Sequence, residues 1–558
     1  MKNLKYITTA LGCSALLLTS CMEEYSPQSS IVTGEQAASS STSFQDFVNA
    51  LTTPLSGLGS YRGDPTSFPY DFGITSLWLT RDVFGMDIIP VNEGWFSTWY
   101  EAAYQGPNYA YPQMPLTDYY KWIKSCNSVI SMAGEDPVDN LWDGLGQAYA
   151  MRAYFYMDLA QMYAPETYRQ NPNGLSCVYI ADTTTPDQAT HNPRKTNQEI
   201  FELIIQDLNN AEKYIAGYNR PDITTPDISV VYGLKARAYL VMGEWENAER
   251  YAKLAQQGYT MMTAAQYTSK SDGFNTPNSA WMFATRFQSQ DPCILLNDAD
   301  SSWGSWMIYE ITPVSACGYA CNYGYPMNID RHLYETIPTT DIRRDVFVDF
   351  ALNDLSREDC IEALRYYSDY PETVYATGNE NGYSGGVGGI PLKFRAAGGS
   401  EGHDNQYIGF CTWIPMMRVE EMMLIEAEAA GMQNEGRGIQ LLTAFAQQRD
   451  PQYVYGTHNE AYGNTSTPAF QNECWWQRRV ELWGEGFATL DIKRLQKGII
   501  RNYENTNHVD MYRWNTTTPP TWMTIVYCQT ESNYNFDLVN NDTPVPPTGN
   551  SEPPYNWN

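Results

Sequence analysis

The sequence predicts a mostly helical fold, in which pairs of helices form a scaffold for long irregular loops and a few short strands. Three observations support this prediction. Apolar residues recur at helical spacing in several long segments. Two regions each read as a pair of helices rich in alanine and interrupted by a glycine. Between these two regions, from about residue 260 to 410, Gly, Asn, Asp and Ser replace the helical pattern.

The first helical segments precede the helix pairs. They are residues 119–130, 145–163 and 199–215. In the third segment the apolar residues Ile200, Leu203, Ile204, Leu208 and Ala211 fall on one face of a helix. We therefore expect these segments to pack on a common core.

The clearest helix pair runs from Ile228 to Gln257. Gly243 separates its two helical patterns, and small alanines on both sides allow the helices to approach closely. The pattern resembles the tetratricopeptide signature, which places Leu-Gly before an aromatic residue and Ala on the following helix. A related pattern runs from Arg418 to Phe445 and is expected to break at Gly431. Because the units are unevenly spaced, the sequence predicts tetratricopeptide-like pairs and not a regular solenoid.

The region from about 260 to 410 is expected to be an irregular insertion. Short apolar runs such as Trp281 to Ala284 predict a few strands within its loops. The glycines from Gly385 to Gly389 are not followed by Lys-Ser or Lys-Thr, so they predict a turn and not a phosphate-binding loop.

The N-terminus carries the pattern of an exported and lipidated protein. Lys2 and Lys5 precede an apolar run that ends in Leu-Thr-Ser-Cys at Cys21. This resembles a bacterial lipobox, in which the cysteine is acylated and two or more acyl chains anchor the protein stably. The alternative is an ordinary signal peptide with a chance cysteine. We expect a signal peptide at 1–20, a lipid-anchored tether at 21–40 and a single domain at 41–558.

Composition excludes several classes of protein. The chain has 35 Lys and Arg against 64 Asp and Glu, a net charge of −29, and no basic stripe, which argues against a nucleic-acid partner. Its 43% of hydrophobic residues, 14% aromatic, argue against disorder. Beyond residue 20 no window of 18 apolar residues occurs, so no membrane-spanning helix is expected.

Cysteines and histidines predict neither a disulfide framework nor a metal centre. The nine cysteines after Cys21 are scattered and odd in number. Cys317 and Cys321 either pair or are small buried hydrophobic residues. The five histidines show no ligand spacing with any cysteine. Two acids, Asp298 and Asp300, are too few to predict bound calcium. No nucleophile elbow or cofactor fingerprint occurs either, so no catalytic residues and no cofactor are predicted.

Three segments together resemble the SusD/RagB family of surface lipoproteins of Bacteroidetes. They are Met151–Tyr163 (MRAYFYMDLAQMY), Met417–Ala429 (MRVEEMMLIEAEA) and Arg478–Arg494 (RRVELWGEGFATLDIKR). Their order, the lipobox, the helix pairs and the length all fit. Ala488 and Thr489 depart from the His-Arg that is usual after Glu-Gly.

The resemblance implies a SusD-like fold and a binding role, not catalysis. Such a protein captures oligosaccharides or polysaccharides at the cell surface and passes them to a SusC-like TonB-dependent transporter in the outer membrane. The acidic pair Glu23 and Glu24, directly after the lipobox, resembles the surface-export signal of these lipoproteins. The alternative within the family is a RagB-like protein that binds oligopeptides for uptake. A glycoside hydrolase, which needs two facing carboxylates, is the rival outside it.

The third family segment is interpreted as structural. Trp476, Val480, Trp483 and Phe487 are spaced as the buried face of a helix. The charged residues of this segment alternate in sign, so we expect them to form an Arg–carboxylate network that docks the last helices. Its members are Arg478, Arg479, Glu481, Glu485, Asp491 and Arg494.

Two loop segments are candidates for glycan binding. A sugar presents flat C–H faces and a rim of hydroxyls, so its site needs exposed aromatic rings beside polar groups. Residues 92–100 contain Trp95 and Trp99, and residues 298–309 contain Trp303 and Trp306. We expect at least one of these four rings to contact the ligand, and Tyr323 and Tyr325 are weaker candidates. The alternative is that the rings are buried under their own loops.

Overall fold

The structure is a computed structural model, and it describes residues 41–57, 68–91, 94–312 and 318–557. The predicted signal peptide at 1–20, the lipidated Cys21 and the tether at 21–40 lie outside these residues, as does Cys317. Within the described part of the chain, no helix combines the length and apolar character that crossing a bilayer requires.

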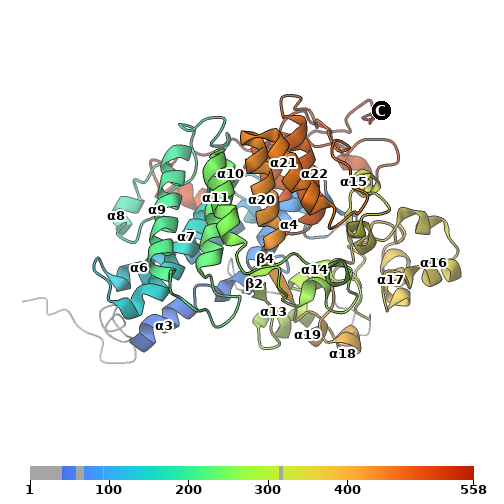
Figure 1. Ribbon diagram of the computed structural model, residues 1–558, viewed down its shortest axis with the longest axis horizontal. Helices are drawn as coiled ribbons and strands as arrows, with labels where there is room; N and C mark the ends of the chain where they lie inside the picture. Colours follow the sequence, from blue (N-terminus) through green and yellow to red (C-terminus); the bar gives the residue numbers. More distant parts are fainter. Residues whose placement is uncertain (1–40, 58–67, 92–93, 313–317, 558) are drawn as a thin grey trace, which may run out of the picture.

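Long helices packed side by side form the scaffold (Figure 1). They are α6 (Ala110–Ala133), α7 (Trp142–Tyr163), α9 (Asn197–Ile215), α10 (Ile228–Met242), α11 (Trp245–Ala255), α20 (Val419–Gln433), α21 (Glu435–Ala446) and α22 (Ala469–Glu481). Helix α11 packs against α20, so the helices before and after the insertion form one continuous array. The predicted mostly helical scaffold is confirmed.

The pair α10–α11 follows the predicted pattern. Asp227 caps α10 by accepting hydrogen bonds from the N–H groups of Ser229 and Val230. Gly243 ends the helix in the left-handed conformation, at φ 76°, which glycine adopts without a steric cost. The alanines of the interface are buried, as close packing of two helices requires. They are Ala236, Ala238, Ala248, Ala252 and Ala255.

The prediction that Gly431 breaks the second pair is wrong. Helix α20 continues through Gly431 to Gln433, and α21 begins after Asn434, whose side chain accepts from the N–H of Arg437. A Cβ on Gly431 would lie 2.0 Å from the ring of Phe470, and one on Gly438 would lie 2.2 Å from Gly431. The glycine therefore permits close packing between α20, α21 and α22 instead of ending a helix.

Two short antiparallel sheets lie beside the helices. Strand β1 (Ile88–Pro90) pairs with β3 (Met327–Ile329), and β2 (Trp281–Arg286) pairs with β4 (Trp413–Arg418). The strand predicted at Trp281–Ala284 is confirmed. Both sheets join the insertion to segments outside it, which fixes the insertion on the scaffold.

The remaining helices are short, and many lie in the insertion, which is more helical than predicted (Figure 1). They are α3 (Ser41–Asn49), α4 (Ile74–Phe84), α5 (Ser97–Tyr100), α8 (Pro186–Ala189), α12 (Ala264–Tyr267), α13 (Pro292–Leu295), α14 (Trp303–Met307), α15 (Arg331–Thr336), α16 (Arg357–Leu364), α17 (Pro371–Asn379), α18 (Gly399–His403), α19 (Gln406–Gly409), α23 (Ala488–Arg494) and α24 (Gln529–Tyr534).

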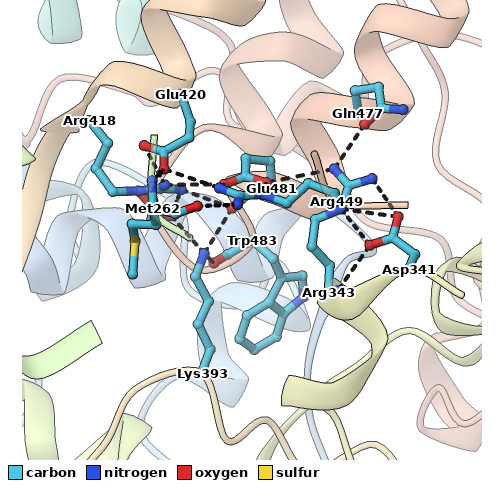
Figure 2. A network of polar contacts seen from close by, with 11 residues as sticks. Met262, Asp341, Arg343, Lys393, Arg418, Glu420, Arg449, Gln477, Glu481 and Trp483 are labelled. Carbon is cyan, nitrogen blue, oxygen red and sulfur yellow. Dashed lines mark hydrogen bonds and ion pairs between the residues drawn. The ribbon is translucent and has the colours of Figure 1, made fainter. Parts of the chain in front are cut away.

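A buried ion network joins α22 to β4 and to the insertion (Figure 2). Glu481 accepts from Arg449 Nε at 3.0 Å and from Arg418 Nη1 at 3.1 Å. Lys393, from the insertion, lies with its Nζ 2.6 Å from the carboxylate of Glu485. Burial alone would raise the pKa of Glu481, but Arg449 and Arg418 hold it well below its ordinary range. The network thus connects three parts of the chain that are far apart in sequence.

The predicted network of the third family segment is confirmed, with partners from outside it. Arg478 pairs with Asp491 at 2.6 Å across the break that follows α22. The other two arginines reach distant acids: Arg479 pairs with Asp87 at 2.6 Å, and Arg494 pairs with Glu428 at 2.5 Å.

The aromatic stripe of the same segment is only partly as predicted. Trp476, Val480 and Trp483 are buried, whereas Phe487 is half-buried because α22 already ends at Glu481. The guanidinium groups of Arg237 and Arg478 lie 5.0 and 5.6 Å from the Phe487 ring centroid.

Candidate functional site

Trp95 is the one predicted tryptophan with an exposed ring. Its side chain is 37% exposed, and its indole N–H donates to the Tyr319 hydroxyl at 3.1 Å. The centroid of its ring lies 5.6 Å from that of buried Tyr70. These contacts hold the ring in place while part of it stays open to solvent.

Tyrosines surround Trp95 and form what we call the aromatic surface. Its rings are Trp95, Tyr104, Tyr109, Tyr111, Tyr319, Tyr323 and Tyr325, all exposed or half-buried. The ring centroid of Tyr104 lies 5.1 Å from that of Tyr109 and 6.5 Å from that of Tyr111, and Tyr111 lies 5.7 Å from Tyr70, which also contacts Trp95. Tyr319, which accepts the hydrogen bond from Trp95, lies 5.2 Å from Tyr323 and 5.9 Å from Tyr325. Two segments more than 200 residues apart therefore supply rings to one surface.

Buried rings support this surface from below. Trp306 stacks on Tyr319 with a centroid distance of 4.2 Å and an angle of 3°. Trp99 lies edge-on to Tyr111 at 4.7 Å and to Tyr70 at 5.2 Å. A ring fixed by aromatic neighbours loses little freedom when a ligand binds, so the support keeps the surface preorganised.

The other three candidates for glycan contact, Trp99, Trp303 and Trp306, do not face solvent, so the buried alternative holds for these rings. Each is at most 2% exposed. Trp99 and Trp306 lie on the short helices α5 and α14, whose inner faces pack on the core, and the indole N–H of Trp306 donates to the Pro69 carbonyl at 3.3 Å. Trp303 packs edge-on against Phe394 at 5.1 Å and is not part of the surface. Glycan contact by Trp95 stays a prediction.

Four rings of the surface were not candidates from the sequence: Tyr104, Tyr109, Tyr111 and Tyr319. The first three recur in the Gly/Pro/Asn-bearing stretch AYQGPNYAY, and this pattern could have indicated them. The weaker candidates Tyr323 and Tyr325 do lie at the surface, beside Tyr319.

The backbone around the rings has unusual conformations. Ala102 and Tyr104 both adopt positive φ, at 50° and 53°, which costs free energy for residues other than glycine. Tyr104 is nevertheless 57% exposed, so its ring gains little from packing there. Gly94 lies so close to Tyr325 that a Cβ would be 3.3 Å from the ring. Strained and close-packed backbone of this kind is typical of loops selected for binding.

A buried carboxyl lies under the Tyr319–Tyr323 side of the surface. Asp300 is 5% exposed and accepts a hydrogen bond from the Gly318 N–H at 2.7 Å. Burial raises the pKa of Asp300 to about 7, although the bonds from Gly318 and from the Tyr323 hydroxyl oppose the shift. The loop that carries Tyr319 and Tyr323 therefore rests on a group that titrates near neutral pH.

Replacing Asp300 by asparagine is expected to change the pH dependence of stability. A folded pKa above the unfolded value means that the folded protein binds the extra proton, so stability falls as the pH rises from about 4 to about 7. An asparagine side chain at this position would keep an acceptor for Gly318 without titrating. The thermal midpoint of Asp300→Asn relative to the wild type should thus rise between pH 5 and pH 8, by roughly 2–4 °C. A constant difference across that range, measured by calorimetry, would contradict this account.

Asp298, the other acid considered for calcium, is engaged differently. Its carboxylate accepts from the Tyr407 hydroxyl at 3.0 Å. Within the described ranges, no three His, Cys, Asp or Glu side chains converge as a set of metal ligands. Cys321 is buried, and Cys317, with which it was considered to pair, lies outside those ranges.

The fold and the site define a class of protein: a scaffold of tetratricopeptide-like helix pairs whose loops carry an aromatic surface. The sequence model of a SusD-like family, described as starch-binding associating with outer membrane, matches residues 82–240, from α4 to α10. A SusD-like protein of Formosa agariphila is 21% identical over 417 residues, which cover 68% of this chain and 72% of that protein. The predicted resemblance is confirmed by these two matches: the chain is similar to SusD-like proteins.

Solved structures show the same fold. A SusD-like carbohydrate binding protein from Bacteroides vulgatus matches with a TM-score of 0.67 at 21% identity, over 89% of this chain and 97% of that one. Surface glycan-binding protein A from Bacteroides thetaiotaomicron, solved in complex with laminarihexaose, matches with a TM-score of 0.60 at 14% identity, over 89% and 98%.

Proposed function

We propose that this protein is a cell-surface lipoprotein, anchored in the outer membrane through Cys21, that captures oligosaccharides on its aromatic surface. The observation that carries the proposal is the group of supported, partly exposed rings around Trp95. Such rings stack on the C–H faces of sugars, while tyrosine hydroxyls bond to the sugar rim. The SusD-like family and its carbohydrate-binding members support this use of the surface.

Capture without hydrolysis is part of the proposal. The captured glycan passes to a SusC-like TonB-dependent transporter, and residues 41–558 act as one binding domain. Stacking of a sugar on these rings needs no catalytic group, and several buried acids of the scaffold are engaged with arginines, as Glu481 is with Arg418 and Arg449.

Calorimetric titration of residues 22–558 against a panel of polymers tests the proposal. The panel contains neutral and anionic plant and host polysaccharides together with mixed peptides. Binding of one polysaccharide with a dissociation constant between about 1 μM and 1 mM is the expected result, which corresponds to roughly 4–8 kcal/mol. Binding of peptides alone would replace the proposal by the RagB-like alternative. Release of reducing sugar from a bound polymer would contradict a purely binding role.

A further inference from the structure

The segments that carry the aromatic surface contain acidic residues and no basic ones. Its rings and their supports lie in residues 68–72, 94–111, 298–309 and 318–327. These ranges contain the acids Asp71, Glu101, Asp298 and Asp300. They contain no lysine, arginine or histidine. Asp71 and Asp300 are buried, whereas Glu101 is half-buried and Asp298 is exposed. A ligand on this surface therefore meets hydroxyls and these two carboxylates, and no cationic side chain from the segments that carry the rings.

The segments that border the aromatic surface supply no unpaired basic side chain either. Residues 514–557 approach it where the Gln529 N–H donates to the Pro107 carbonyl at 2.7 Å. That C-terminal segment contains four acids and no basic residue. Beside Tyr323, the backbone of the loop at Asn381 and Gly382 contacts Gly324 closely. The charged residue of that loop, Glu380, forms an ion pair with Arg357 at 3.2 Å, so this arginine already has a carboxylate partner.

Many of the chain's cations are used inside the scaffold. Eleven arginines and four lysines are buried among the described residues. Arg418 and Arg449, for example, are fully buried and bind the carboxylates of Glu420 and Glu481. Nineteen acids are buried among the same residues, so burial removes charges of both signs, but none of these buried cations can reach a ligand.

We infer that the aromatic surface selects neutral saccharides and rejects glycans that carry carboxylate or sulfate groups. Recognition of such anions normally uses arginine or lysine, and none lies in the segments that carry the rings. The acidic surroundings also repel a polyanion before contact, whereas hydroxyl groups bond to carboxylates and tyrosines without a charge penalty. This inference rests on the proposed function and narrows its substrate class.

The test compares three forms of one polysaccharide that binds in its neutral form. They are the native polymer, its carboxymethyl derivative and its hydroxyethyl derivative, whose substituent is of similar size but uncharged. At about 10 mM salt we expect the carboxymethyl form to bind about tenfold more weakly than the hydroxyethyl form. Near 0.5 M salt the difference should shrink to less than about threefold, because salt screens exposed charges.

A charge placed among the rings provides a second measurement. Asn108 is exposed and lies in the loop between Tyr104 and Tyr109. Asn108→Lys should raise the affinity for the carboxymethyl form several-fold at low salt and leave the hydroxyethyl form unchanged. Asn108→Gln, which lengthens the side chain without a charge, is the matched control and should change neither.

Failure of the inference differs from failure of the proposed function. If the carboxymethyl form bound as tightly as the hydroxyethyl form, and Trp95→Ala removed both, charge selection would be refuted and glycan binding at this surface retained. If no saccharide, neutral or anionic, bound at any salt concentration, the proposed function itself would be overturned.

Discussion

Replacing Trp95 by alanine is expected to weaken glycan binding by about 30-fold, or roughly 2 kcal/mol, which is the size of a hot-spot effect. Trp95 is the largest ring of the aromatic surface, and it contacts Tyr319 directly and buried Tyr70, which also contacts Tyr111. Its removal takes away the largest stacking face of the surface. Because the ring is already partly exposed, the thermal midpoint should change little.

The chain offers a matched control for this measurement. Trp142 is 36% exposed, close to the 37% of Trp95, and its indole N–H also donates one hydrogen bond, to the Pro137 carbonyl at 3.0 Å. It begins α7 and belongs to no part of the aromatic surface. Trp142→Ala should leave affinity unchanged in the same titration. Equal affinities of the Trp95→Ala variant and the wild type would place the site elsewhere.

Replacing Glu481 by glutamine is expected to lower the free energy of unfolding by about 3–5 kcal/mol. The Glu481 carboxylate is fully buried and lies within 4 Å of three guanidinium groups, those of Arg343, Arg418 and Arg449. Glutamine has nearly the same volume but removes the negative charge, which leaves buried cations without full compensation. The effect should appear as a lower denaturation midpoint followed by circular dichroism.

The contribution of Glu481 to the free energy of unfolding depends on pH with the opposite sign to that of Asp300. Since the folded pKa of Glu481 lies below its ordinary value, its contribution is complete above the unfolded pKa near 4.5. It is lost as the pH falls through the lower folded value. The wild type and Glu481→Gln should therefore differ most at neutral pH and converge on acidification.

Glu335→Gln is the control for the ion network. Glu335 pairs with Arg331 at 2.7 Å, but its side chain is 52% exposed. A solvent-exposed pair contributes only about 0–1 kcal/mol, so this variant should be close to the wild type. If both substitutions had the same small effect, the buried network would not stabilise the fold as described here.

The sequence pattern within single segments was sufficient to predict the helical scaffold. The Asp227 cap, the left-handed Gly243 and the alanines of α10 and α11 act within one helix pair, so a single segment of sequence contains the information. The same holds for the pair Arg478–Asp491, whose partners are 13 residues apart. Gly431 was misjudged because glycine both breaks helices and permits close packing, and the distant Phe470 decides which applies.

The buried ion network shows what the sequence pattern of a single segment cannot predict. The alternation of charge around Glu481 predicted that it pairs, yet its partners Arg343, Arg418 and Arg449 come from other elements. Ion pairs between segments depend on how β4, α22 and the insertion meet in space. Spacing along one helix therefore predicts that a buried charge needs a partner, without naming it.

The sequence by itself determined the helical scaffold, the SusD-like resemblance and the presence of aromatic loops with few cations. Only the tertiary structure decided which rings face solvent. Trp95 and Trp306 occur in similar Gly- and Ser-bearing loops, but Trp306 stacks beneath Tyr319, whereas Trp95 lies at the exposed edge of the same cluster. Exposure of a ring depends on what packs over it, and Trp306 is covered both by nearby Tyr319 and by Phe96 and Pro69, which are more than 200 positions away.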